Sequence, residues 1–116
     1  IEFSAEGYAH VKQYLLKNNR DNSPQGSVYA FFASTGPGFI WMKIGRSKNP
    51  ASRMKQYEGP AVPTHIIGSY PVDDMVTDEA RVLAHFRKRY VSVRKEWFKI
   101  PTEAKEAVTA AFDKLF

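Results

Sequence analysis

Apolar residues recur at helical spacing near the start of the chain, at Tyr8, Val11 and Leu15. Ser4 precedes them and can act as an N-cap, so we expect a helix over residues 3–18. The stretch that follows is polar and rich in turn-forming residues, which predicts a linker before the main part of the chain.

Aromatic and β-branched residues then predict strands. Residues 28–33 and 39–44 flank a Ser-Thr-Gly-Pro-Gly turn, and this pattern is typical of a β-hairpin. Residues 66–72 predict a third strand, and residues 96–100 predict a short extended piece.

Three further helices are expected among and after these strands. Asn49 can cap the first of them, with Pro50 at the first helical position, and this helix should end near Gly59. Residues 74–90 carry apolar side chains at a period of about 3.6 residues. The last helix begins around Thr102 and presents one continuous apolar stripe.

The order of these elements predicts the α+β class, with a three-stranded sheet flanked by helices and an extra N-terminal helix. We divide the chain into an N-terminal helix and linker, residues 1–26, and a main domain, residues 27–116.

Length and composition narrow the class of protein. The 116 residues suffice for one compact domain but not for two. There is no apolar run long enough to cross a bilayer and no signal peptide, so we expect no membrane association. The lack of cysteine excludes disulfides and thiolate zinc sites, and it favours an intracellular protein of the cytoplasm, nucleoid or nucleus.

The net charge of +5 is concentrated in two acid-free basic blocks, residues 43–55 and residues 81–95. Either block alone is more often a solvated helix face whose acidic partners lie elsewhere. Two blocks on one small domain favour a nucleic-acid partner, which they would attract and bind. From these blocks we predict nucleic-acid contacts at Arg46, Lys48, Lys55 and Arg87.

Glu79 interrupts the apolar stripe of the helix over residues 74–90. A carboxylate in that place is costly unless it is paired, protonated or bound to a metal. Alternatively, Glu79 lies in the first turn of the helix, where the helix dipole favours a negative charge that still reaches water. The periodicity alone leaves both interpretations open.

Tyr29, Lys43, Arg46 and Arg53 bring a phenol, an ammonium and two guanidinium groups onto neighbouring predicted elements. A site that handles phosphodiesters needs such cations, together with a group that can move a proton. Each residue also has an ordinary interpretation: Tyr29 as a core aromatic, Lys43 and Arg46 at a strand end, and Arg53 in a surface pair with Tyr57. The three histidines show no metal-ligand spacing.

Five short motifs follow one another in a fixed order. They are Val28-Tyr29, Lys43-Ile44-Gly45-Arg46-Ser47, Asn49-Pro50 with Arg53, Glu79, and Glu96-Trp97-Phe98. In this order they resemble the GIY-YIG nuclease superfamily, and within it the phage-type subfamily whose second motif reads Lys-Ile-Gly. The resemblance covers residues 27–100 and implies a three-stranded antiparallel sheet flanked by helices.

The resemblance also implies a divalent-metal-dependent nuclease. Glu79 would hold Mg²⁺ or Mn²⁺, and Arg53 would bind the scissile phosphate. Tyr29 would orient or deprotonate the attacking water with Lys43 beside it, and Arg46 would hold a neighbouring phosphate.

Two positions depart from the family pattern. The tyrosine of the second motif, often the general base, is Lys43, and a histidine often found four residues after the glutamate is Leu83. An asparagine that many members carry late in the domain has no counterpart that we can place.

Three functions follow from these observations. The first is a metal-dependent endonuclease domain acting on DNA, with sequence choice supplied by a fused or partner domain. The second is a non-catalytic nucleic-acid-binding module on the same fold. The third is a protein-interaction module that uses the aromatic residues around Trp41 and Trp97.

Overall fold

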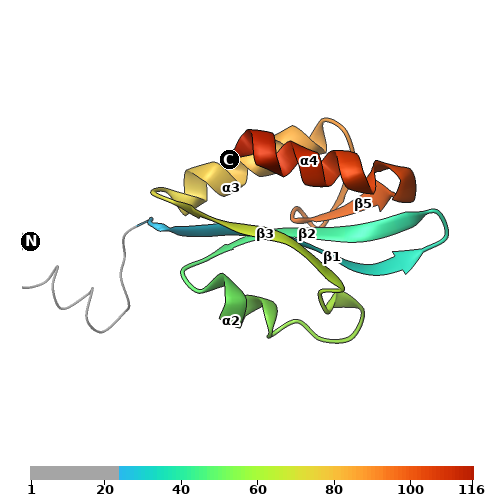
Figure 1. Ribbon diagram of the computed structural model, residues 1–116, viewed down its shortest axis with the longest axis horizontal. Coiled ribbons are helices and arrows are strands. Elements are labelled where there is room, and N and C mark those ends of the chain that lie inside the picture. The colour runs from blue at the N-terminus through green and yellow to red at the C-terminus, as the bar shows by residue number, and fades with distance from the viewer. Residues whose placement is uncertain (1–23) are drawn as a thin grey trace, which may run out of the picture.

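The computed structural model describes residues 24–116, and the helix that we expect over residues 3–18 lies outside the described residues. The described chain forms one antiparallel sheet with helices on both faces (Figure 1). Its five strands lie in the order β3-β1-β2-β5-β4. They are β1 (Gly26–Gly36), β2 (Phe39–Ser47), β3 (His65–Val72), β4 (Val91–Val93) and β5 (Trp97–Pro101).

The prediction of a three-stranded sheet is wrong, because a second hairpin, β4–β5, extends the sheet beside β2. Its turn contains no Gly, Asn or Pro. Instead, Arg94 (φ 51°) and Lys95 (φ 70°) adopt the left-handed conformation. Since long side chains rarely take this conformation, no turn signal in the sequence marks the hairpin.

Three helices and two 3₁₀ turns complete the described part of the chain. They are α2 (Pro50–Met54), η1 (Gly59–Ala61), α3 (Met75–Arg87), η2 (Thr102–Ala104) and α4 (Lys105–Leu115). Asn49 caps α2 as predicted, because its Oδ1 accepts a hydrogen bond of 3.1 Å from the backbone N–H of Ser52. In residues 24–116 no helix combines the length and the apolar character needed to cross a membrane.

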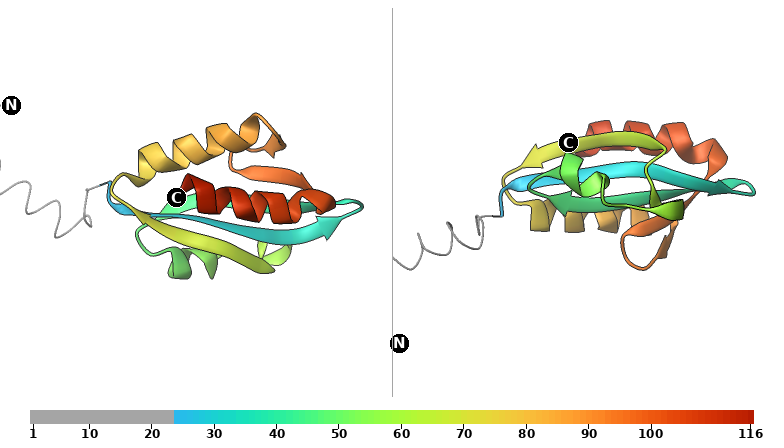
Figure 2. Two further views of the ribbon diagram at one scale, coloured as in Figure 1. Left: turned by 45° about the horizontal axis from the view of Figure 1, so that its top comes forward. Right: turned by 90° about the horizontal axis from the view of Figure 1, so that it is seen from below.

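Both faces of the sheet are covered, by α3 and α4 on one side and by α2 on the other (Figure 1 and Figure 2). Successive residues of β1 point to opposite faces. Val28 and Phe32 therefore pack under α3 and α4, whereas Tyr29 and Phe31 pack towards α2, and all four are 0–1% exposed. The interior strand β1 thus fixes the position of any polar group that it carries.

The strand β2 changes neighbours along its length. Its ladder with β5 ends at the pair Lys43–Trp97, after which the backbone N–H of Ile44 still donates to the carbonyl of Glu96 at 3.0 Å. From there to Ser47 its only strand partner in the described sheet is β1. The sheet is therefore narrower at this end, and side chains from its two faces can approach each other around the edge of β2.

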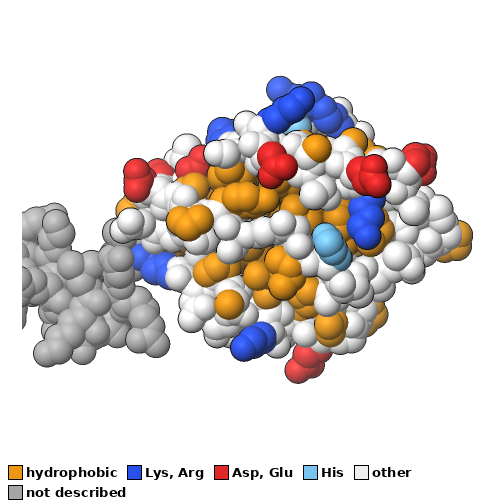
Figure 3. All heavy atoms as spheres, viewed as in Figure 1, with side chains coloured by type: hydrophobic (Ala, Val, Ile, Leu, Met, Phe, Trp, Pro, Cys, Tyr) orange, Lys and Arg blue, Asp and Glu red, His pale blue; other side chains and the backbone are white. Residues whose placement is uncertain are grey.

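Lys and Arg side chains gather over the C-terminal end of α3 (Figure 3). Basic side chains along α3 also bind other parts of the protein. Arg81 donates a hydrogen bond of 2.8 Å to the carbonyl of Leu115, and Arg87 donates one of 2.8 Å to the carbonyl of Lys95. The second basic block therefore helps to connect α3 with α4 and with the β4–β5 turn.

Candidate active site

Tyr29 lies in the middle of β1, directly opposite Gly45 of β2. Its ring crosses so close to this glycine that a Cβ there would lie 2.4 Å from the Cζ and Oη of Tyr29. The glycine of the Lys-Ile-Gly motif is therefore required by the close approach of the phenol. The Tyr29 hydroxyl is hydrogen-bonded to the hydroxyl of Tyr57, with 2.7 Å between the two oxygens.

Burial raises the pKa of the Tyr29 phenol well above its ordinary value of 10.0, and the hydrogen bond to Tyr57 raises it further. Arg53 opposes this increase in part, and hydrogen bonding to Tyr29 and Tyr57 raises the pKa of Arg53 in turn. At neutral pH the phenol is therefore protonated and can orient a water or a phosphate oxygen. It is a poor candidate for a base.

Lys43 projects from β2 on the same face as Phe31, its register partner in β1. Its side chain is only 8% exposed and forms an ion pair with the carboxylate of Glu96, which is 39% exposed. The Lys43 ammonium also lies 5.7 Å from the centre of the Trp97 ring. Glu96 belongs to the closing motif, but its role could not be predicted because its partner, Lys43, lies 53 residues earlier in the chain.

Glu79 is 3% exposed on the buried face of α3. Its Oε1 accepts a hydrogen bond of 2.6 Å from Nη1 of Arg46, whereas its Oε2 is buried without a hydrogen-bond partner. Burial raises the pKa of Glu79 and the negative charge of Glu96 raises it further, against the opposing effect of Arg46 and Lys43. Of the two sequence interpretations, the buried and paired carboxylate is therefore the one observed.

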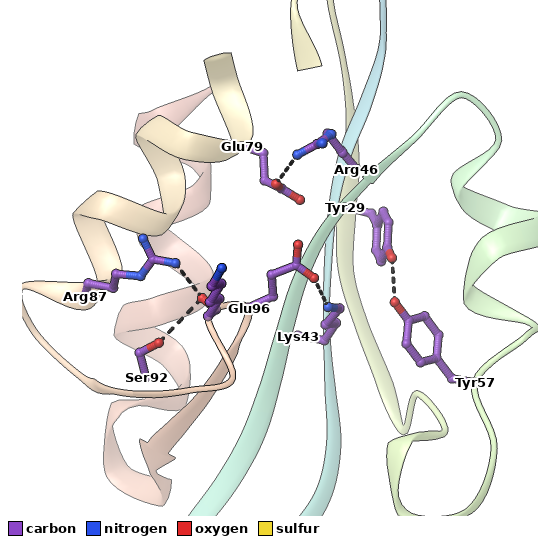
Figure 4. A network of polar contacts seen from close by, with 9 residues as sticks. Tyr29, Lys43, Arg46, Tyr57, Glu79, Arg87, Ser92 and Glu96 are labelled. Atoms are coloured by element: carbon purple, nitrogen blue, oxygen red, sulfur yellow. Dashed lines mark hydrogen bonds and ion pairs between the residues drawn. The ribbon is translucent and has the colours of Figure 1, made fainter. Parts of the chain in front are cut away.

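These side chains meet at the edge of β2, past the end of the β5 ladder (Figure 4). Tyr29 and Lys43 belong to the face that carries α2, whereas Arg46 and Glu79 meet on the face under α3. The Glu96 carboxylate lies between Lys43 and Glu79 in this view. The structure thus joins four of the predicted residues to two that the sequence did not single out for a role, Glu96 and Tyr57.

The other predicted nucleic-acid contacts lie at different distances from this site. Lys48 precedes α2 in the sequence and Lys55 directly follows it, and both are exposed. This helix carries Arg53. Arg87 is eight residues after Glu79 along α3, about 12 Å away at 1.5 Å per residue, and it contacts the β4–β5 turn (Figure 4). The structure therefore does not bring Arg87 together with Glu79.

The donor groups suit a metal that the substrate helps to bind. Residues 24–116 contain no cluster of three or more His, Asp or Glu side chains that could hold an ion by themselves. Mg²⁺ often uses only one or two carboxylates and completes its shell with waters and substrate phosphates. The unpartnered Oε2 of Glu79 fits that requirement.

Comparison with protein families corrects the resemblance drawn from the motifs. The model of the T5orf172 domain matches residues 26–115. This is a different family from GIY-YIG, so the assignment to the GIY-YIG superfamily and its phage-type subfamily is wrong. The motifs misled because they are short and partly reflect local packing, such as the glycine beneath Tyr29, whereas the family model spans the domain from β1 to α4.

No curated protein and no solved structure matches the chain. The T5orf172 domain is nuclease-like and DNA-binding in character, which is compatible with a function on nucleic acid. The matched residues include every side chain of the site described above. The chain belongs to the T5orf172 domain family.

Proposed function

We propose that this domain is a metal-dependent endonuclease that hydrolyses phosphodiester bonds in DNA. The observation that carries the proposal is Glu79, a buried carboxylate with one unpartnered oxygen at an edge lined by cations. A buried carboxylate oxygen without a partner destabilises the fold. Its presence in a site lined by cations therefore makes Glu79 a candidate for a functional role. Arg46 and Lys43 lie near this carboxylate and Arg53 lies beside Tyr29, and such cations suit a phosphodiester.

The two arginines are assigned to the phosphates. Arg53 is exposed beside the Tyr29 and Tyr57 hydroxyls, so it can bind the scissile phosphate and stabilise the charge that develops there. The Arg46 side chain is 42% exposed. It can therefore exchange Glu79 for a neighbouring backbone phosphate without becoming an unpaired buried charge.

Proton transfer is assigned to the other side of β2. Tyr29 orients the attacking water as a hydrogen-bond donor, since its phenol is protonated. Lys43 is an ammonium held by Glu96, which suits charge stabilisation better than proton abstraction. Glu96 is the carboxylate available beside Lys43, and we assign to it the proton that the water loses.

Mg²⁺ or Mn²⁺ is the proposed cofactor, with Glu79 as its protein ligand. When bound, the metal would supply charge stabilisation to the phosphoryl group. Because none of the roles assigned above involves contact with a base, we assign the choice of target sequence to a fused or partner domain.

The test is cleavage of supercoiled plasmid by the full chain with Mg²⁺, Mn²⁺ or EDTA. Glu79→Gln keeps the shape of the side chain and removes its charge. Asp78→Asn is the matched control, because Asp78 is the next acid on the same helix and pairs with Arg81 outside the site. We expect metal-dependent cleavage by wild type and Asp78→Asn, and none by Glu79→Gln.

DNA binding by Glu79→Gln, measured in EDTA, should be retained. If Glu79→Gln still cuts at the wild-type rate, Glu79 has no part in the reaction and the proposal fails. If no variant cuts although all bind DNA, the second function below is supported instead.

Nucleic-acid binding without cleavage is the second candidate function. It is favoured because two of the proposed catalytic side chains already form ion pairs within the protein. Glu79 is already paired with Arg46, and Lys43 is already paired with Glu96. A binding module requires only exposed cations. Its affinity for nucleic acid would therefore depend on salt, and it would be unchanged by Glu79→Gln whichever metal ion is present.

A further inference from the structure

A second site lies on the face of the sheet that carries α2, the face seen from below in Figure 2. It is a pocket of about 280 Å³ between η1, the strands β2 and β5, and the β4–β5 turn. Trp41 and Trp97 supply aromatic surface to its lining, Pro60 and Val93 add apolar surface, and Arg94 adds a positive charge. None of the roles assigned above uses this pocket.

The lining restricts what the pocket can hold. None of the described residues that line it is acidic, and its one charged side chain is Arg94. Its volume is just below the roughly 300–1,000 Å³ of pockets for drug-sized ligands. Aromatic walls and a cation in so small a volume suit a single planar ring system attached to an anionic chain.

The pocket lies next to the candidate active site, because Trp97 contacts residues of both. Trp97 directly follows Glu96, and its ring centre lies 5.7 Å from the Lys43 ammonium. The same ring packs edge-on against Tyr57, with 6.3 Å between the ring centres. Tyr57 in turn is hydrogen-bonded to Tyr29. The rings of Trp97 and Tyr57 therefore lie between a group in the pocket and the Tyr29 hydroxyl.

We propose that the pocket binds one unstacked nucleobase of the substrate strand, next to the phosphate bound at Tyr29, Lys43 and Arg53. This inference rests on the proposed function, since it requires a nucleic acid at the site. Stacking on aromatic side chains is tolerant of sequence, because every base has a π-face. A base within a continuous duplex must first be unstacked, so the site selects single strands, gaps or mismatched positions.

A protein partner is the competing occupant, since exposed tryptophans also serve protein interfaces. The charges favour nucleic acid. Arg94 lines the pocket beside the two tryptophans, and Lys99 lies 4.4 Å from the ring of Phe39, which packs on Trp41. A polyanion satisfies these cations without needing a designed set of acidic partners.

The chain offers a direct optical test, because it contains only two tryptophans and both line the pocket. Full-length protein in EDTA is titrated with a single-stranded oligothymidylate and with an abasic backbone of the same length and charge. We expect the oligothymidylate to quench tryptophan emission and to bind roughly 5- to 150-fold more tightly, the equivalent of the ~1–3 kcal/mol of one base–aromatic stack. A blunt duplex of the same length should leave the emission nearly unchanged.

Variants locate the effect. Trp41→Ala should remove most of the preference for bases over the abasic backbone, and Trp41→Phe should restore part of it. Phe116→Ala is the matched control, because Phe116 is a 39% exposed aromatic that stacks on Tyr70, away from the pocket. It should behave as wild type.

The outcomes separate this inference from the proposed function. Equal affinity of wild type for the two single strands, with unchanged emission, would overturn the base site while leaving phosphate binding and cleavage intact. Failure to bind either single strand at moderate salt would overturn the base site and leave the pocket to a protein partner, whereas cleavage of plasmid would test the proposed function separately. Loss of cleavage activity with the base preference intact would overturn only the catalytic proposal.

Discussion

Tyr29 is fixed from two sides, by Gly45 across the sheet and by Tyr57 at its hydroxyl. Its ring has no room to move, since it is 1% exposed in the interior strand β1. The protonation state of the phenol is therefore a property of the fold, and so is the position from which it can donate a hydrogen bond.

Gly45→Ala should destabilise the domain by about 1–3 kcal/mol, the usual cost of overpacking a buried position. The added Cβ would lie 2.4 Å from the Tyr29 ring, closer than any tolerated contact. Urea denaturation measures the loss. Tyr29→Leu removes the atoms that clash, so Gly45→Ala should cost clearly less in that background; equal costs in the two backgrounds would show that the ring is not the obstacle.

The raised pKa of Tyr29 predicts the alkaline stability of the domain. A phenol whose pKa is higher in the folded state than in the unfolded state binds its proton more tightly when the protein is folded. Its contribution to the free energy of unfolding is therefore fully present below pH 10.0 and declines as the pH rises towards the pKa of the folded state. Between about pH 9 and about pH 11, the free energy of unfolding measured in urea should therefore fall less for Tyr29→Phe than for wild type. An equal loss for both proteins would mean that the phenol ionises as it does in the unfolded chain.

Residue chemistry and spacing were enough to choose Tyr29, Lys43, Arg46 and Glu79, which the structure brings to one edge of the sheet. They were not enough to find the ion pair of Lys43 with Glu96. That pair depends on the register of β5 against β2, which follows from packing over a long sequence separation. The family resemblance failed for a related reason, since short motifs carry less information than a match over the whole domain.

At the scale of elements, the hairpin over β1 and β2 and the capped start of α2 were predictable from local signals. The β4–β5 hairpin was not, because Arg94 and Lys95 form its turn against their own conformational preference. The faces of α3 were also only partly predictable. Val76, one of the apolar residues of the helix predicted over residues 74–90, is 50% exposed, because Glu79 and Val82 lie on the face towards the sheet instead.

Lys95→Gly should raise the free energy of unfolding by about 1 kcal/mol, because glycine adopts a φ of 70° without strain. Lys95→Ala removes the same charge but keeps a Cβ, so it should stay within about 0.5 kcal/mol of wild type. Both variants retain the Lys95 carbonyl that accepts the hydrogen bond from Arg87. Chemical denaturation of the three proteins measures the difference, and identical behaviour of the two variants would contradict a strained turn.

At the scale of the whole molecule, the two basic blocks differ in what they bind. The block around α2 lies beside the site, with Arg46 and Arg53 within it. The block on α3 is partly occupied by contacts within the protein, such as those of Arg81 with Asp78 and with the carbonyl of Leu115. Because the block around α2 lies beside the site, we expect it to provide most of the contacts to phosphates.

The salt dependence of DNA binding in EDTA distinguishes the two blocks. Lys55→Ala should lower the slope of log affinity against log salt concentration by about 1, as expected for the loss of one phosphate contact. Arg81→Ala removes an equal charge from α3 and should leave the slope unchanged. The reverse result would place the nucleic acid across α3.

The most direct test of the central claim is single-turnover cleavage of labelled DNA with the protein in excess, because it separates the chemical step from binding. With Mg²⁺, wild type and Asp78→Asn should cut at the same rate. Glu79→Gln should be slower by at least about a hundredfold at an unchanged half-saturating concentration. A Glu79→Gln rate within about tenfold of wild type would contradict the account, since the barrier would then have risen by no more than about 1.4 kcal/mol.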